Sequence, residues 1–167
     1  MKRTQNPALF LTRGAIIAAL YVVLTYLCAL LGLSSGVIQL RISEALCILP
    51  MFFAEAVPGL YIGCIIANLV AVSSPWDILF GSLATLLGAF GARLLRRLPT
   101  KLAWIATLPT IIANALIVPP VLIFAYGATD AYWFILLTVF IGELISAGIL
   151  GYILYLCFKR SGLNLRL

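Results

Sequence analysis

Polar residues interrupt an otherwise apolar stretch at residues 37–50, VIQLRISEALCILP. Gln39 and Arg41 carry hydrogen-bond donors, whereas Glu44 carries a carboxylate that accepts hydrogen bonds. Residues three apart lie on one face of a helix, so Arg41 and Glu44 can pair with each other. They can also contact a polar solute together. The residue types leave both uses open. Which use applies depends on the helices and loops that position the two side chains.

The rest of the chain has the composition of a membrane protein. Apolar residues make up 64% of its 167 residues and charged residues 10%, whereas soluble domains average roughly 45–50% and 25%. The apolar residues form long runs rather than ten-residue alternating segments, which favours helices over a β-barrel. The sequence therefore predicts an all-α integral membrane protein with a single domain.

Glycine, proline, serine and charged residues divide the chain into six candidate transmembrane helices. We place them at about residues 12–32, 40–55, 58–72, 76–95, 102–125 and 131–158. The second and third are short for a hydrocarbon core of about 30 Å. No small-residue cleavage site follows the first apolar segment, which indicates a retained span rather than a signal peptide.

The basic residues test this count of six. They fall before the first span, between the fourth and fifth, and after the sixth: Lys2, Arg3, Arg13; Arg93, Arg96, Arg97, Lys101; Lys159, Arg160, Arg166. Six spans put all three groups on one side of the membrane, and the positive-inside rule then predicts that both termini are cytoplasmic. Arg41 would be the one basic residue on the outer side.

Polar groups within the spans are predicted to converge at one depth. Asn114 and Glu143 lie about 14 and 15 residues from the expected outer turn near Ala128, which is about 20 Å at 1.5 Å per residue. Asn68 and Glu44 also fall in the outer half. Polar groups inside a membrane need a partner or a ligand, so these four predict a pocket that opens outward.

Each of these groups also has a structural interpretation. Asp77 ends the sequence SPWD (residues 74–77), which is typical of a helix start with serine at the N-cap and a capping box. Asn68 and Asn114 could equally join helices by hydrogen bonds. Glu143 has no basic residue at its depth, and a protonated, hydrogen-bonded carboxyl is the alternative to a ligand contact.

Small residues near the start of the first span provide a close-packing surface. Ala15, Ala18 and Ala19 form it, and such ridges pack against helices of the same chain or of another membrane protein. Glu55 stands beside the predicted cytoplasmic turn at Val57-Pro58-Gly59, where we expect it to be solvated.

Several classes of function are excluded by what the sequence lacks. It contains no GxxxxGK[ST], HExxH or GxSxG motif, so no ATPase, metalloprotease or serine hydrolase site is predicted. It has no histidine and no CxxC pair, so no metal site or cofactor is expected. The net charge of +6 comes from residues at span ends, which argues against a nucleic-acid partner. A small binding subunit that uses energy from partner proteins fits better than an enzyme.

Four motifs in order carry a family resemblance: VIQLRISEALCILP, SSPWDILFGSLATLLGA, ATLPTIIANALIVP and IGELIS. Over about residues 11–158 the chain resembles the QueT family, the substrate-binding S components of energy-coupling-factor (ECF) transporters for queuosine precursors. The resemblance implies a six-helix, multi-pass protein of the bacterial cell membrane. It also implies docking through Ala15 and Ala19 onto an ECF transmembrane coupling subunit, with two cytoplasmic ATPase subunits that hydrolyse ATP.

The implied substrate is a 7-deazaguanine such as preQ1 or queuine, captured from outside. Carboxylates can accept from its N1–H and amino group, and amides or arginine can donate to its carbonyl. The expected substrate-binding residues are Glu143, Asn114, Asn68, Glu44, Arg41, Gln39 and Asp77, with Trp76 and Trp133 to stack or cap the mouth. We expect Glu143 at the base and Glu44 nearer the entrance. Another vitamin-like heterocycle, or a structural membrane protein without a transport role, is the alternative.

Overall fold

The computed structural model describes residues 7–33, 39–71 and 74–161 of the chain, and these residues form helices and turns without any strand. The elements in order are α1 (Pro7–Leu30), the 3₁₀ helix η1 (Ile42–Met51), α2 (Ala56–Val70), α3 (Pro75–Leu94), the 3₁₀ helix η2 (Thr100–Thr107), α4 (Leu108–Tyr126), α5 (Tyr132–Glu143), the π-helix η3 (Leu144–Leu150) and α6 (Gly151–Arg160). The predicted all-α class is confirmed for this part of the chain.

Among the described residues, four helical stretches are long and apolar enough to cross a membrane. They are Pro7–Leu30, Pro75–Leu94, Thr100–Tyr126 and Tyr132–Arg160. Large apolar side chains such as Leu11, Leu94 and Phe124 lie exposed on them. Extended apolar surface of this kind marks contact with a membrane, so the chain is a multi-pass membrane protein.

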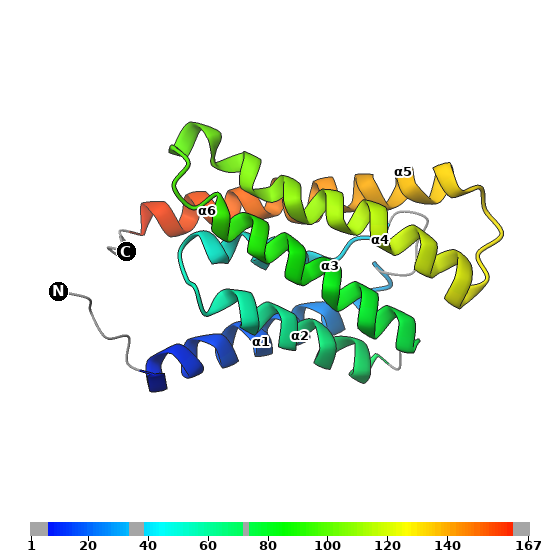
Figure 1. Ribbon diagram of the computed structural model, residues 1–167, viewed down its shortest axis with the longest axis horizontal. Coiled ribbons are helices and arrows are strands. Elements are labelled where there is room, and N and C mark those ends of the chain that lie inside the picture. The colour runs from blue at the N-terminus through cyan, green and yellow to red at the C-terminus, as the bar shows by residue number, and fades with distance from the viewer. Residues whose placement is uncertain (1–6, 34–38, 72–73, 162–167) are drawn as a thin grey trace.

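The segment predicted as a second span, residues 40–55, has a different structure. It contains the ten-residue 3₁₀ helix Ile42–Met51, whose side chains from Ser43 onward are buried. At about 2.0 Å per residue this helix is about 20 Å long, and Pro50 has no N–H to extend the backbone ladder. It packs against α1, α3, α6 and η3 in the middle of the bundle (Figure 1).

The helix expected over residues 40–55 is therefore a shorter 3₁₀ helix, Ile42–Met51. An irregular backbone is tolerated at membrane depth where protein surrounds it, and this enclosure also shields the polar residues of the segment. The predicted third span corresponds to α2, which has 15 residues. The count of six spans stays a prediction.

Helices α1 and α2 pack with their backbones in close contact. A Cβ atom at Gly59 would lie 2.6 Å from the carbonyl oxygen of Gly14, and one at Gly63 would lie 2.9 Å from that of Ala18. Only glycine fits at such positions without a shift of one helix. Gly59 and Gly63 thus serve packing within the chain.

The basic groups gather at one end of the bundle. Helix α1 begins at this end, and α3 and α6 end there (Figure 1). Arg13 lies near the start of α1, Arg93 in the last turn of α3, and Lys159 and Arg160 in the last turn of α6. Lys2, Arg3 and Arg166 lie outside the described residues. The shared end agrees with an even number of crossings between the groups, and its cytoplasmic location stays a prediction.

Glu55 is not solvated, contrary to our expectation. It is 5% exposed, and its Oε1 lies 3.3 Å from Nη1 of Arg13 on α1. The same guanidinium lies 5.7 Å from the centre of the Phe53 ring. Arg13 supplies the positive charge that pairs with Glu55. The two side chains meet only because α1 packs against the start of α2.

Candidate functional site

Glu44 lies at the centre of the bundle, where protein groups surround it. The Tyr21 hydroxyl donates a hydrogen bond to Oε1, the Cys47 thiol donates to Oε2 at 3.2 Å, and Thr85 Oγ1 lies 3.4 Å from Oε1. The side chain is 1% exposed. Its two oxygens therefore already have donors from α1, η1 and α3, which supports a structural role for this carboxylate.

A second polar cluster has unused hydrogen-bonding capacity. Glu143 is 5% exposed, and Asn114 and Thr110 are 2% and 1% exposed. Among the described residues, Glu143 Oε2, Asn114 Nδ2 and Thr110 Oγ1 have no hydrogen-bond partner. Buried polar atoms are almost always hydrogen-bonded, and unpaired ones cost most at membrane depth. These three atoms are the strongest candidates for ligand contacts.

The three side chains come from facing helices. Asn114 on α4 interacts electrostatically with Glu143 at the end of α5. Thr110 stands one turn before Asn114, so both lie on the same face of α4. Asn114 and Glu143, which are predicted to lie at one depth because they are equally far from the α4–α5 turn, lie beside each other. Thr110 was missed, although its spacing of four from Asn114 could have identified it.

Arg41 brings a positive charge to this cluster. Arg41 is half-buried as a residue, and its guanidinium is within electrostatic reach of Glu143, Glu44 and Asp77. It forms no close ion pair with the carboxylates of the described residues, so the local pair of Arg41 with Glu44, one of the two uses that the sequence left open, is not formed. Gln39 precedes it, and the backbone of Gln39 lies against α5. Arg41 therefore has donors available for a ligand.

Asp77 and Asn68 have protein partners at the start of α3. Ser74 caps this helix, and its Oγ accepts from the N–H of Trp76 at 3.2 Å. The Ser74 N–H donates to the Tyr126 hydroxyl at 3.1 Å, and this hydroxyl donates to Asp77 Oδ2 at 3.0 Å. Asn68 Nδ2 donates to the Asp77 carbonyl oxygen at 3.3 Å. The predicted capping box thus closes through a tyrosine from α4, which the local sequence could not indicate.

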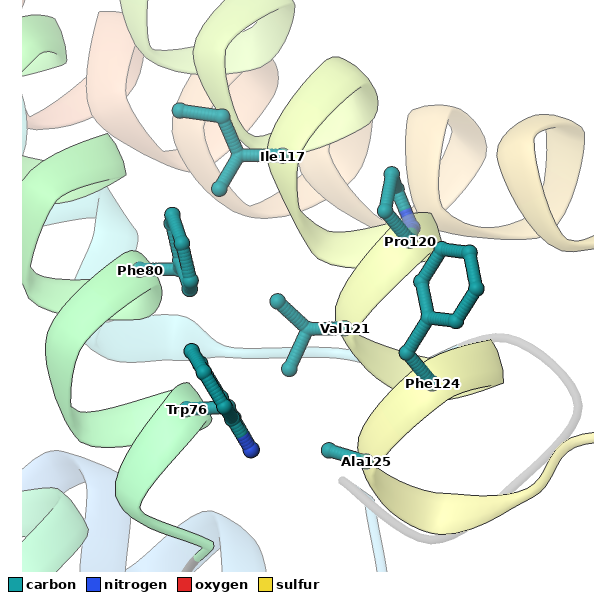
Figure 2. A pocket seen from close by; sticks show the side chains of 7 residues that line it. All are labelled: Trp76, Phe80, Ile117, Pro120, Val121, Phe124 and Ala125. Atoms are coloured by element: carbon teal, nitrogen blue, oxygen red, sulfur yellow. The ribbon is translucent and has the colours of Figure 1, made fainter.

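The two predicted aromatic caps are exposed. Trp76 stacks on Phe80 with ring centres 6.0 Å apart, and Trp133 meets the edge of Tyr132 at 5.4 Å. Trp76 and Phe80 form one wall of a groove of about 430 Å³ between α3 and α4 (Figure 2). Its other lining residues are Ile117, Pro120, Val121, Phe124 and Ala125. Side chains of this kind suit an apolar occupant, so we place the polar solute at the Glu143 cluster instead.

The three alanines of the predicted docking ridge separate into two groups. Ala15 and Ala19 are exposed on α1, whereas Ala18 is buried against Gly63 of α2. Only Ala15 and Ala19 are therefore available to another protein. Ala18 takes part in packing within the chain.

Comparison with known proteins gives the family. The family model described as QueT transporter matches residues 11–160. The chain belongs to the QueT transporter family. This confirms the resemblance seen in the four motifs, and with the long apolar helices it identifies a multi-pass protein of the bacterial cell membrane.

One curated QueT relative is the queuosine precursor transporter QueT of Lactococcus lactis subsp. cremoris (strain MG1363). It is 41% identical to this chain over 73 residues, which is 43% of this chain and 42% of the relative. The match thus spans less than half of the relative's length. No solved structure matches the chain significantly.

Proposed function

We propose that the chain is the S component of an ECF transporter and captures a queuosine precursor, a 7-deazaguanine such as preQ1 or queuine, from outside the cell. The observation that carries this proposal is a pair of buried polar atoms on facing helices, Glu143 Oε2 and Asn114 Nδ2, that have no hydrogen-bond partner in the part of the chain that the structure describes. The name of the Lactococcus relative supports the substrate class.

The chemistry of the cluster suits a guanine-like ring. The Glu143 carboxylate can accept from the ring N1–H and the exocyclic amino group at once. Asn114 and Arg41 supply N–H donors for the ring carbonyl and N3. Thr110 adds a hydroxyl that either donates or accepts. The Asn114 amide and the Glu143 carboxylate, on opposite helices, can thereby hydrogen-bond to the acceptor groups and the donor groups of the ring.

The remaining features of the proposal concern uptake. The chain crosses the membrane with six helical segments, and both termini face the cytoplasm. It docks on an ECF transmembrane coupling subunit, and the two ATPase subunits of that module hydrolyse ATP. The chain itself is not an enzyme. Exposed Ala15 and Ala19 near the basic end of α1 support this docking surface.

Bulky substitutions on α1 should separate docking from binding. Ala15→Trp and Ala19→Trp are expected to lower uptake by the complete transporter about tenfold or more, because a bulky side chain prevents close approach of a partner helix. A tenfold loss corresponds to about 1.4 kcal/mol of docking free energy. Substrate affinity of the isolated chain should stay within about twofold. Radiolabelled uptake and calorimetry measure the two quantities.

Ala18→Trp is the matched control, because Ala18 packs on Gly63. It should lower the unfolding temperature, whereas the other two substitutions should not. Normal uptake by Ala15→Trp and Ala19→Trp would remove this face of α1 from the docking surface.

A ligand panel tests the substrate class. A ligand present at about 100 times its Kd stabilises the folded state by about 2.7 kcal/mol, so its binding raises the unfolding temperature. We expect such a rise with preQ1 or queuine, and none with riboflavin or pyridoxine. A rise with either vitamin alone would assign the chain to another heterocycle. The absence of any rise would favour a structural membrane protein.

A further inference from the structure

The helix that carries Glu143 changes from an α-helix to a π-helix directly after this residue. Helix α5 ends at Glu143, and the π-helix Leu144–Leu150 follows before α6 begins. A π-helix has wider turns than an α-helix and is often found at functional sites. Residues 142 and 146 therefore lie about one turn apart along the helix, with Glu143 between them in sequence.

Because Gly142 has no side chain, the backbone of residues 39–41 can pack directly against this part of α5. A Cβ atom at Gly142 would collide with the carbonyl oxygen of Gln39 and would lie 3.2 Å from the carbon of that carbonyl. Backbone atoms cannot move aside as the end of a flexible side chain can. Any larger residue at position 142 must therefore displace the 39–41 segment or the helix.

Ser146 holds the same segment by a hydrogen bond. The backbone N–H of Arg41 donates to Ser146 Oγ at 3.2 Å, and Ser146 is 1% exposed. The segment is thus fixed at two points on one helix, at Gln39 by contact with Gly142 and at Arg41 by the hydroxyl. Since the guanidinium of Arg41 is within electrostatic reach of Glu143, these contacts determine where its charge lies relative to that carboxylate.

We propose that Gly142 and Ser146 are positioning residues, which seat residues 39–41 so that Arg41 and Glu143 contact the solute together. This inference rests on the proposed function, because it assigns these residues to the same binding site. Neither residue needs to touch the solute.

Substitutions at Gly142 in α5 and at Ser146 in the π-helix test whether these residues position the 39–41 segment. Gly142→Ala should weaken preQ1 binding about tenfold or more, because overpacking forces the segment away. Ser146→Ala should weaken it about three- to tenfold through the lost hydrogen bond. The matched control is Gly148→Ala, whose new Cβ would meet the ends of the Ile111 and Leu144 side chains at 3.4 Å and the Glu143 carbonyl oxygen at an ordinary contact distance of 4.0 Å. Its affinity should stay within about twofold of the wild type.

A double-mutant cycle distinguishes positioning from a general loss of structure. If Ser146 acts through Arg41, Ser146→Ala should weaken binding by less than about twofold when Arg41→Ala is already present. If the fold losses in preQ1 affinity of the two single variants multiply fully in the double variant, the proposal is overturned. Should Gly142→Ala fail to fold, the cycle with Ser146→Ala still decides.

The outcomes also separate this inference from the proposed function. Wild-type affinity in both Gly142→Ala and Ser146→Ala would show that these residues do not position the 39–41 segment for binding. The proposed function would not be affected by this result. Failure of the wild-type protein to bind preQ1 or queuine would overturn both.

Discussion

Glu143→Gln is expected to weaken binding of preQ1 by about ten- to a hundredfold while the protein stays folded. Hydrogen bonds to a charged group contribute about 1.5–3 kcal/mol, and each 1.4 kcal/mol is a factor of ten in affinity. Gln retains the shape of Glu but has only one acceptor oxygen, so it cannot accept from both donors of a guanine-like edge. Calorimetric titration of the two purified proteins measures the difference.

The matched control for this change is Asp130→Asn, which also removes one negative charge but from an exposed loop position. Its affinity should equal that of the wild type. Unchanged affinity in Glu143→Gln would remove Glu143 from the site. A lower unfolding temperature without ligand would indicate that the substitution acts on the fold.

Glu44→Ala should destabilise the ligand-free protein by about 2–4 kcal/mol. The substitution removes the carboxylate acceptor of the buried Tyr21 hydroxyl and leaves it only the long contact with Thr85 Oγ1 at 3.4 Å, at a cost of about 1–3 kcal/mol. It also opens a cavity in the core, which adds to the loss. Glu44→Gln keeps one carbonyl oxygen for Tyr21 and should lose less than about 1.5 kcal/mol. Unfolding of both variants in detergent, monitored by circular dichroism, tests whether Glu44→Ala loses more stability than Glu44→Gln.

This result would assign Glu44 to the fold, whereas the sequence had placed it at the entrance of the site. A Glu44→Ala variant of wild-type stability that no longer binds preQ1 would contradict the structural assignment. In that case the partners of Glu44 would be dispensable, and its carboxylate would be free to contact the solute.

The long helices were predictable because apolar runs bounded by charges and prolines fix their extent. The predicted spans 76–95, 102–125 and 131–158 agree closely with Pro75–Leu94, Thr100–Tyr126 and Tyr132–Arg160. Residues 40–55 were not predictable in the same way. An apolar run has the same composition whether it forms an α-helix facing lipid or a 3₁₀ helix enclosed by protein, and only the packing distinguishes them.

The proximity of two residues of the candidate site was predictable, because their helices form a hairpin. Equal distances from the turn brought Asn114 and Glu143 together because antiparallel helices rise at the same rate. Contacts between distant segments were not accessible. The partners of Glu44 on α1 and α3 are such contacts, and so is the pair of Arg13 with Glu55, 42 residues apart. The sequence therefore suggested Arg41 or a solute as the partner of Glu44 and water as the partner of Glu55, whereas both carboxylates have other protein partners in the fold.

Titration of the purified wild-type chain with preQ1 in a calorimeter tests the central claim most directly. The proposal predicts saturable binding of one ligand per chain, with unlabelled queuine or preQ1 competing for the same site and riboflavin failing to compete. The absence of saturable heat with either 7-deazaguanine, in protein that is folded by circular dichroism, would contradict it.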